Sequence, residues 1–294
     1  MSTQSRKVLV TGAAGNLGRA VCAELEKRGH SVRGTDKKLS AEAGSDFVPG
    51  DLLDEFFARR ALAGCDALVH LGNHPNRFAG PSDQRLLAEN TAMNANIFLS
   101  AIDQGIECLV FASSIQAMLR AAGGRQPPPF PIPYLPIDGE APADPGLNTY
   151  ALSKVFAELL LRTQCERRGN LSATALRFPM LPLPWAVKSF TDPGGIPRER
   201  LNLAECLAHL TLSDAACAIA EALEHALPGY HQYLPAVSTQ IEGMDTARLV
   251  AEFYPEVPLR KPAKEFDSLI DISALQTELG WAPRERMRIR LRAE

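Results

Sequence analysis

A glycine-rich turn near the start of the chain limits the possible folds more than any other feature. The stretch 7–19 reads KVLVTGAAGNLGR and carries glycines at positions 12, 15 and 18. Its apolar run predicts a buried strand, and the periodic segment from Leu17 to Leu25 predicts a helix. Three glycines at a helix start often mark only tight packing of a strand on a helix. They also leave room for a pyrophosphate, which the first amides of the helix attract.

The spacing of these glycines resembles that of a known family. The general dinucleotide fingerprint is G-x-G-x-x-G, whereas this chain has G-x-x-G-x-x-G in the stretch TGAAGNLG. This variant is similar to the extended short-chain dehydrogenase/reductase family, also called the NAD-dependent epimerase/dehydratase family. The resemblance implies a nicotinamide dinucleotide held at Gly12, Gly15, Asn16, Leu17 and Gly18.

Short apolar strands alternate with helical segments, and this alternation predicts an α/β fold. We expect a Rossmann-type doubly wound parallel sheet, which binds its ligand beyond the carboxyl ends of the strands. Residues 1–178 are assigned to an NAD(P)-binding domain that also carries the catalytic residues. Residues 179–294 are assigned mainly to a small C-terminal substrate-binding domain, from which some segments can return to the sheet. The strands expected after the first are 31–35, a third from Phe47 onward, 67–72, 109–114 and 173–177.

The composition argues against several classes of partner. The chain has 31 basic and 34 acidic residues and no long block of one sign, so we expect neither a nucleic acid nor a membrane as partner. The N-terminal stretch MSTQSRK lacks the apolar core of a signal peptide, and no segment is long enough to span a membrane. Six scattered cysteines without a C-x-x-C pair and six dispersed histidines indicate reduced thiols, a cytoplasmic location and no metal site.

The end of the second expected strand bears on the choice of cofactor. Asp36 stands there, where a carboxylate accepts hydrogen bonds from the adenosine ribose and repels a 2′-phosphate. Lys37 and Lys38 follow it and would attract that phosphate instead. A solvated turn explains the same aspartate about as well. We therefore expect NAD, with NADP as the less favoured alternative.

Two later segments resemble further parts of the family's cofactor site. In GDL at 50–52 the resemblance implies that Asp51 and Leu52 contact the adenine, since Asp54 is available to cap the next helix. The segment ALVHLG at 67–72 is similar to the family's strand along the cofactor cleft. It contributes Leu71 and Gly72 to the expected cofactor contacts.

Four more residues are interpreted with the help of the resemblance. Asn90 lies in a helix expected over 83–103, which resembles the family's asparagine-bearing helix beside the active site. Pro179 lies near the segment that the family places beside the nicotinamide. His70, inside an apolar run, is interpreted as a packed core histidine rather than a catalyst. Asn73 stands where the family has a small residue.

The motif Tyr150-Ala-Leu-Ser-Lys154 carries the expected chemistry. On a helix, positions i and i+4 share a face, so the phenol and the ammonium point into one cleft. A free tyrosine has a pKa of about 10, and a nearby lysine, a helix N-terminus and the positive nicotinamide ring would favour its phenolate. We expect Tyr150 to be the general acid–base, and Lys154 to bind the nicotinamide ribose as well. The resemblance implies that Ser114, the second serine of LVFASS, holds the substrate oxygen.

The joint order of the motifs predicts an NAD(P)-dependent oxidoreductase that transfers hydride at a hydroxyl or carbonyl group of a sugar-like substrate. The Y-x-x-x-K motif alone is more often a surface helix, but here it follows the glycine turn, GDL, the asparagine-bearing helix and the two serines in the family's order. The segments HLG at 70–72 and FASS at 111–114 are similar to those of uronate dehydrogenases.

Two other functions stay open at this point. A nucleotide-sugar epimerase or dehydratase would oxidise its substrate transiently with tightly held NAD, and Lys188, Arg198 and Arg200 could bind its phosphates or simply be solvated. The small C-terminal domain leaves little room for such a substrate, and Ile115 and Gln116 replace the Asp-Glu pair of the dehydratases. The second alternative is a non-catalytic dinucleotide-binding sensor, against which the retained catalytic motif counts.

Two stretches, 120–146 and 150–161, predict a surface loop and a dimer interface. Prolines crowd the region 120–146, which predicts an extended surface loop across the substrate cleft. The segment 150–161 is apolar on more than one face, beyond what a single core-facing stripe requires. The family commonly pairs this helix across a two-fold axis. We therefore expect a homodimer.

Overall fold

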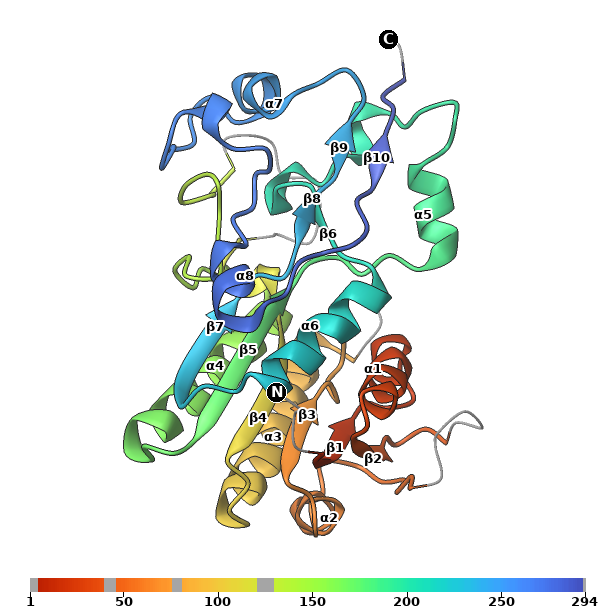
Figure 1. Ribbon diagram of the computed structural model, residues 1–294, viewed down its shortest axis with the longest axis vertical. Helices are drawn as coiled ribbons and strands as arrows, with labels where there is room; N and C mark the ends of the chain where they lie inside the picture. Colours follow the sequence, from red (N-terminus) through yellow and green to blue (C-terminus); the bar gives the residue numbers. More distant parts are fainter. Residues whose placement is uncertain (1–4, 40–45, 76–80, 121–129, 293–294) are drawn as a thin grey trace.

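A six-stranded parallel sheet forms the centre of the computed structural model, which describes residues 5–39, 46–75, 81–120 and 130–292 (Figure 1). The strand order is β2-β1-β3-β4-β5-β7, and every neighbouring pair runs parallel. The strands are β1 Lys7–Thr11, β2 Ser31–Thr35, β3 Ala67–His70, β4 Cys108–Ser114, β5 Ser172–Phe178 and β7 Gly229–Tyr233. The predicted α/β fold with a parallel sheet is confirmed.

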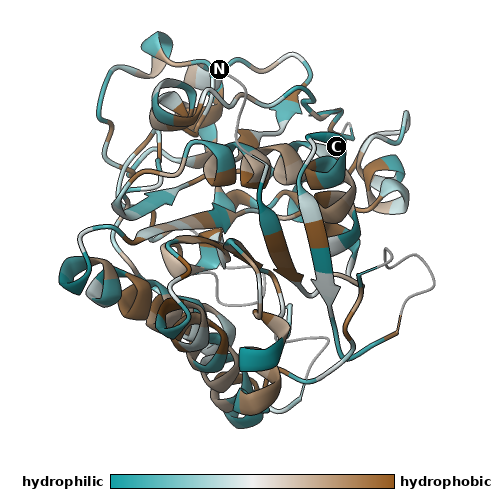
Figure 2. Ribbon diagram, turned by 60° about the horizontal axis from the view of Figure 1, so that its bottom comes forward, coloured by the Kyte–Doolittle hydropathy of each residue, from teal (hydrophilic) through white to brown (hydrophobic). Residues whose placement is uncertain are grey.

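Helices cover both faces of this sheet, and successive strand residues point to opposite layers. Val8 and Val10 share a core with α1 (Asn16–Lys27) and α6 (Leu212–Glu224). Leu9 shares a core with the other layer, which comprises α2 (Glu55–Ala61), α3 (Asp83–Asp103) and α4 (Thr149–Arg167). Because both sides of each strand are buried, the strands are apolar runs rather than alternating patterns. Figure 2 shows hydrophobic residues on strands and on helices alike.

A second group of elements lies beyond the carboxyl ends of the strands, in the upper part of Figure 1. It comprises α5 Pro184–Phe190, β6 Ala208–His209, β8 Val237–Ser238, β9 Gln240–Ile241, α7 Thr246–Phe253 and β10 Arg288–Ile289. Strand β6 pairs with β8 antiparallel, and β9 pairs with β10 parallel. Their shared apolar core contains Ile115, which directly follows β4, together with Tyr254 and Ile289.

Three elements beyond residue 178 belong to the large sheet or to the helical layers around it. Strand β7 pairs with β5, and α6 packs against α1. Helix α8 (Ser273–Leu279) contributes Leu275 and Leu279 to the core that Val8 and Val10 share with α1 and α6. The division of the chain at residue 178 stays a prediction.

The third strand that we expected from Phe47 onward is reduced to an isolated bridge between Phe47 and Gly34. The segment does lie beside β2, because the amide of Val48 donates to the carbonyl oxygen of Gly34 at 2.9 Å. The pairing continues past Pro49, because the amide of Gly50 donates to the carbonyl oxygen of Asp36 at 3.1 Å, but it does not form a regular strand. The expectation of a regular strand here was wrong.

The proline-dense region is also different from what we expected. Its stretch 121–129 lies outside the described residues. From residue 130 onward the chain is not a surface loop, because Phe130, Ile132, Leu135 and Ile137 are buried in the second apolar core. Proline favours an extended backbone, and here the residues between the prolines are large and apolar. The extended chain therefore fills a core.

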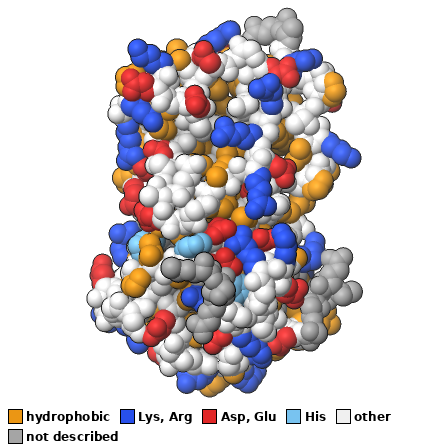
Figure 3. All heavy atoms as spheres, viewed as in Figure 1, with side chains coloured by type: hydrophobic (Ala, Val, Ile, Leu, Met, Phe, Trp, Pro, Cys, Tyr) orange, Lys and Arg blue, Asp and Glu red, His pale blue; other side chains and the backbone are white. Residues whose placement is uncertain are grey.

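The surface agrees with the balanced composition. On the face seen in Figure 3, basic and acidic side chains are intermingled over both parts of the molecule. Within the described ranges, no helix is long and apolar enough to cross a membrane.

Candidate active site

The turn between β1 and α1 is so tight that two positions require glycine. Gly12 has a φ of +69°, and a Cβ there would lie 2.9 Å from the carbonyl carbon of Leu71. A Cβ on Gly18 would lie 2.2 Å from the carbonyl oxygen of Gly12. The glycines therefore let the start of α1 pack directly on the turn.

The same turn leaves the start of α1 open to an anion. Gly15 is the N-cap of α1 and offers no side-chain acceptor to the first amides of the helix. Gly15 and Asn16 are exposed, and Leu17 is half-buried beside them. An open, unblocked helix start of this kind fits a pyrophosphate. Arg19, which we did not select from the sequence, adds a guanidinium that donates to the carbonyl oxygen of Ala14 at 2.8 Å.

Asp36 lies beside this turn. One oxygen of its carboxylate accepts a hydrogen bond of 3.2 Å from the amide of Ala14, and the other accepts one of 3.0 Å from the amide of Lys38. The end of β2 therefore presents a carboxylate that two backbone amides hold next to the glycines. The two lysines that follow it, Lys37 and Lys38, are exposed to solvent.

The GDL segment packs against the end of β3. Leu52 is buried, and its Cδ1 lies 2.9 Å from where a Cβ on Gly72 would stand, so the small residue at position 72 admits the leucine. Asp54 caps α2 by accepting from the amides of Phe56 and Phe57, as predicted. Asp51 is exposed, and its carboxylate accepts from the amide of Leu53 at 3.0 Å.

A hydroxyl group joins the glycine turn to the end of β3. Thr11 Oγ1 accepts hydrogen bonds from the amides of Leu71 and Gly72, at 3.1 and 3.0 Å. The same atom lies 2.7 Å from Nδ1 of His70, whose Nε2 is 2.9 Å from Asn94. His70 is fully buried, and burial lowers its pKa to about 3. The interpretation of His70 as a packed core histidine is confirmed.

Ser114 and Tyr150 meet where β4 ends and α4 begins. Ser114 is the last residue of β4, and its Oγ accepts a hydrogen bond of 3.2 Å from the amide of Gln116. Asn148 caps α4 by accepting from the amides of Tyr150 and Ala151, which fixes the helix start. Its side-chain amide also donates to Gln116 at 2.9 Å. The Ser114 hydroxyl is close enough to the Tyr150 phenol to lower its pKa.

Lys154 lies one turn further along α4 and is bound at two points. Its ammonium donates to the carbonyl oxygen of Ala112 at 2.8 Å and to Asn73 Oδ1 at 2.9 Å. Nothing in the sequence explained an asparagine at position 73, and the structure shows that Asn73 accepts a hydrogen bond from Lys154. An ammonium has three N–H groups, so one donor remains for a ligand.

The electrostatics of the pair differ from the sequence expectation. Burial raises the pKa of Tyr150 to about 12, the Ser114 hydroxyl lowers it, and the charge of Glu205 raises it. Burial lowers the pKa of Lys154 to about 7, and the nearby Glu158 carboxylate raises it. Lys154 therefore does not offset the burial of the phenol. Of the contributions expected to favour the phenolate, the positive nicotinamide ring is the one that a bound cofactor adds.

Asn90 and Pro179 lie close to these residues. Asn90 Nδ2 donates to Ser153 Oγ at 3.2 Å, next to Lys154 in the chain, and its Oδ1 accepts from the amide of His74. Asn90 therefore holds α4 against the segment that follows β3. Pro179 is buried and directly follows β5, whose last residue pairs with Ser114.

A buried ion pair behind the site was not predicted. Arg177 on β5 donates through Nε and Nη2 to the two oxygens of Glu158 on α4, at 3.0 and 2.8 Å. Ser113 donates to the same carboxylate at 2.5 Å. Arg177 also donates to the carbonyl oxygens of Gly139 and Ala141. The sequence shows a Glu four residues after Lys154, but nothing in it shows which side chain the Glu meets.

Two further polar residues reach this site and were also missed. Gln116 Nε2 donates to Glu205 at 3.0 Å, and Glu205 is buried in the C-terminal part of the chain. Gln116 had been considered only as a departure from the dehydratases. Glu205 lies far along the chain, and none of the sequence motifs includes it.

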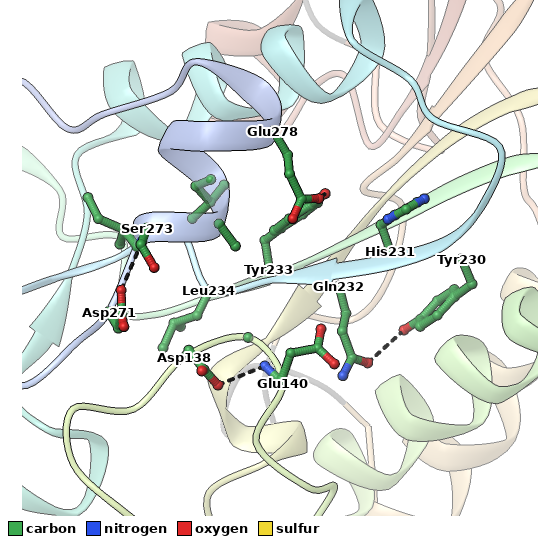
Figure 4. A pocket seen from close by; sticks show the side chains of 14 residues that line it. Asp138, Glu140, Tyr230, His231, Gln232, Tyr233, Leu234, Asp271, Ser273 and Glu278 are labelled. Atoms are coloured by element: carbon green, nitrogen blue, oxygen red, sulfur yellow. Dashed lines mark hydrogen bonds between the residues drawn. The ribbon is translucent and has the colours of Figure 1, made fainter. Parts of the chain in front are cut away.

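A separate pocket of about 220 Å³ lies at the edge strand β7 (Figure 4). None of the predicted site residues lines it. Three of its four carboxylates have donors from the protein, since Asp138 accepts from the amide of Glu140, Asp271 from that of Ser273, and Glu278 from the Tyr233 hydroxyl. Among the residues that the structure describes, no three His, Cys, Asp or Glu side chains gather as metal ligands. The candidate site is therefore the one at Ser114 and Tyr150.

The chain matches a family model and several relatives of known activity. The family model described as "NAD dependent epimerase/dehydratase family" matches residues 8–216. The L-arabinose 1-dehydrogenase (NAD(P)(+)) of Haloferax volcanii is 30% identical over 226 residues, which cover 76% of this chain and 84% of that protein. The uronate dehydrogenase of Agrobacterium fabrum is 31% identical over 174 residues, which cover 57% of this chain and 59% of that protein.

The fold is similar to that of solved structures. A short-chain dehydrogenase/reductase superfamily protein from Agrobacterium tumefaciens, solved with bound NAD, aligns with a TM-score of 0.66 at 23% identity. The alignment covers 96% of this chain and 93% of that chain. At this identity the likeness concerns the fold.

The lowered pKa of Lys154 predicts a pH-dependent stability that Lys154→Met should abolish. Below about pH 7 the lysine is protonated in both the folded and the unfolded state. Between there and its unfolded pKa of about 10, only the unfolded state binds the proton, so the free energy of unfolding rises with pH. From pH 7 to pH 9 the stability of the wild type should gain about 1–2 kcal/mol over that of the variant.

Urea unfolding of both proteins without cofactor, followed by circular dichroism, measures this difference. The comparison with the variant cancels the titration of all other groups. A difference that stays flat or falls over this pH range would show that Lys154 keeps an ordinary pKa.

Proposed function

The chain belongs to the NAD-dependent epimerase/dehydratase family, and on that basis we propose that it is a dehydrogenase that oxidises a hydroxyl group of a small sugar-like molecule with NAD. Family membership confirms the predicted enzyme class, an NAD-dependent enzyme of the extended short-chain dehydrogenase type. A nicotinamide dinucleotide cofactor is part of that class. The choice of a dehydrogenase, its substrate and the roles of individual residues are the proposal.

One chain of hydrogen bonds carries the proposal. Thr11, at the start of the glycine turn, holds the amides of Leu71 and Gly72, and the next residue, Asn73, accepts from Lys154. The expected phosphate end and the expected nicotinamide end of the cofactor site are thereby joined. Ser114 and Tyr150 lie beside Lys154, where a substrate would meet the cofactor.

Each residue of the site has a separate role in the proposed reaction. Bound NAD⁺ supplies the acceptor for hydride. Ser114 Oγ already accepts from an amide, so its own proton is available to the substrate oxygen. Tyr150 takes the proton of the substrate hydroxyl as its general base. Lys154 binds the nicotinamide ribose through its remaining donor. The glycines 12, 15 and 18 with Asn16 and Leu17 hold the pyrophosphate, and Asp36, Asp51 and Leu52 hold the adenosine.

The nature of the relatives and the state of the basic residues support a dehydrogenase over a nucleotide-sugar epimerase. Two sugar dehydrogenases are about 30% identical to the chain. Arg198, proposed as a phosphate ligand, forms an ion pair with Glu252 and packs on the Phe253 ring. Arg200 donates to Ser189 and packs on the Phe190 ring. Both guanidiniums are therefore engaged within the protein, and an epimerase remains the second candidate.

A cytoplasmic location is part of the same proposal. It is supported by the cysteines, all six of which are free thiols. Disulfides are rare in that compartment.

The catalytic assignment predicts different effects of two substitutions. Tyr150→Phe keeps the ring and its packing but removes the ionisable oxygen, so kcat should fall about 10²-fold or more while NAD binding barely changes. Lys154→Met should weaken both turnover and NAD binding, because two roles are assigned to Lys154. The measurement is a screen of aldoses, uronic acids and UDP-sugars with NAD⁺, following the absorbance of the reduced cofactor. Near-normal turnover by Tyr150→Phe would leave the family fold intact and refute the mechanism.

The carboxylate of Asp36 predicts a preference for NAD over NADP. Asp36→Asn keeps the acceptor for the Ala14 amide but removes the charge that repels a 2′-phosphate. The ratio of the dissociation constants for NADP and NAD should be above one in the wild type and should fall about tenfold in the variant. Lys37→Gln is the control and should raise the ratio or leave it unchanged. Equal or tighter binding of NADP by the wild type would show that the lysines outweigh the aspartate.

The outer face of α3 and α4 predicts a homodimer. Phe156 and Leu159 are 41% and 60% exposed on α4, and Leu99 is 40% exposed on the adjacent α3. Such apolar residues are costly to leave in water. We expect a dimer in light scattering at micromolar concentration and a monomer for Leu159→Arg, with the exposed Leu227→Arg as control. A wild-type monomer would refute the prediction.

A further inference from the structure

A buried carboxylate faces the catalytic residues from the C-terminal part of the chain. Glu205 ends the short 3-10 helix Leu203–Glu205 and is 6% exposed. Its Oε1 accepts from Gln116 at 3.0 Å, and its Oε2 accepts from Asn202 at 2.8 Å. Among the described residues, no lysine, arginine or histidine forms an ion pair with it. A carboxylate held by two amide groups and no cation is a costly arrangement.

Glu205 is linked to both Ser114 and Tyr150. Gln116, its donor, also gives its backbone amide to Ser114 Oγ. The other end of the Gln116 side chain accepts from Asn148, the cap of the helix that carries Tyr150. The charge of Glu205 acts on the Tyr150 phenol, whose pKa it raises. The carboxylate therefore lies one residue, Gln116, away from Ser114 and from the cap of the helix that carries Tyr150.

The backbone after Glu205 is forced into an unusual conformation. Cys206 and Leu207 both have a φ of 55°, in the left-handed region that residues other than glycine seldom adopt. The strained pair is closed by a hydrogen bond of 2.9 Å from the amide of Leu207 to the carbonyl oxygen of Asn202. Strain of this kind persists where the surroundings impose it, often at ligand sites. Here it directly follows Glu205, whose carboxylate is held by Gln116 and Asn202.

The chemistry of this carboxylate suits a hydroxyl group. Two carboxylate oxygens offer about four acceptor positions, and the amides of Gln116 and Asn202 occupy two of them. A substrate hydroxyl can donate to those that remain. A substrate carboxylate has no proton to donate, and two negative charges repel each other strongly where water is excluded.

We propose that Glu205 selects a neutral polyhydroxy substrate, because it accepts a hydrogen bond from a substrate hydroxyl and repels an acid group at that position. This inference rests on the proposed dehydrogenase function. It predicts that the enzyme oxidises an aldose in preference to the uronic acid of the same ring configuration. Glu205 is thus a specificity-determining residue, and it does not take the substrate proton.

The test compares kcat/KM for matched pairs, glucose with glucuronate and galactose with galacturonate, at mildly alkaline pH with NAD⁺. The wild type should favour the aldose by about tenfold or more. Glu205→Gln removes the charge at constant size and should lower this preference about tenfold, with NAD binding unchanged. Glu205→Asp keeps the charge and should keep the preference at lower kcat/KM. The exposed Glu199→Gln, six residues earlier, is the control and should behave as the wild type.

The outcomes separate the two proposals. A wild type that favours the uronate, or a preference that Glu205→Gln leaves unaltered, overturns the role of Glu205 while the dehydrogenase function stands. If Glu205→Gln does not fold, loss of the aldose preference in Glu205→Asp overturns it in the same way. A wild type that binds NAD but oxidises neither aldoses nor uronates overturns the proposed function, and this inference with it.

Discussion

The candidate active site depends on the buried ion pair between Glu158 and Arg177. The pair fixes α4 against β5, and through Ser113 it also fixes α4 against β4. Removing one partner of such a pair typically costs about 3–5 kcal/mol, because the other charge stays buried alone. Its bidentate geometry allows one orientation of the two elements. Tyr150 and Lys154 therefore face the end of β4 in a set geometry, whether or not a ligand is present.

The same pair explains how a lysine can be buried beside a tyrosine. Burial disfavours the ammonium of Lys154, and the Glu158 carboxylate one turn away partly compensates. Two fixed acceptors, Ala112 and Asn73, satisfy two of its donors. The result is a cation close to the point at which it loses its proton, next to a phenol that keeps its own. A positive cofactor ring entering this site would change both equilibria, which is how cofactor binding and proton transfer become coupled.

The sequence predicted those parts of the fold and site that depend on neighbouring residues. The glycine turn, the start of α1, the cap at Asp54 and the i, i+4 relation of Tyr150 and Lys154 are all local. What it missed depends on distant partners: Asn73 needs Lys154, Glu158 needs Arg177, and Gln116 needs Glu205. The segment at Phe47 does lie beside β2, but it forms only an isolated bridge there and no regular strand. The proline-dense stretch failed because its apolar residues meet a core built from the last third of the chain.

The central claim is that this chain binds a nicotinamide dinucleotide between the glycine turn and Lys154. Calorimetric titration of the purified protein with NAD⁺ tests it most directly, since it requires no knowledge of the substrate. The account predicts one site per chain with a dissociation constant in the micromolar range, on the order of −8 kcal/mol in binding free energy. Absence of binding of both NAD and NADP by the folded protein would contradict it.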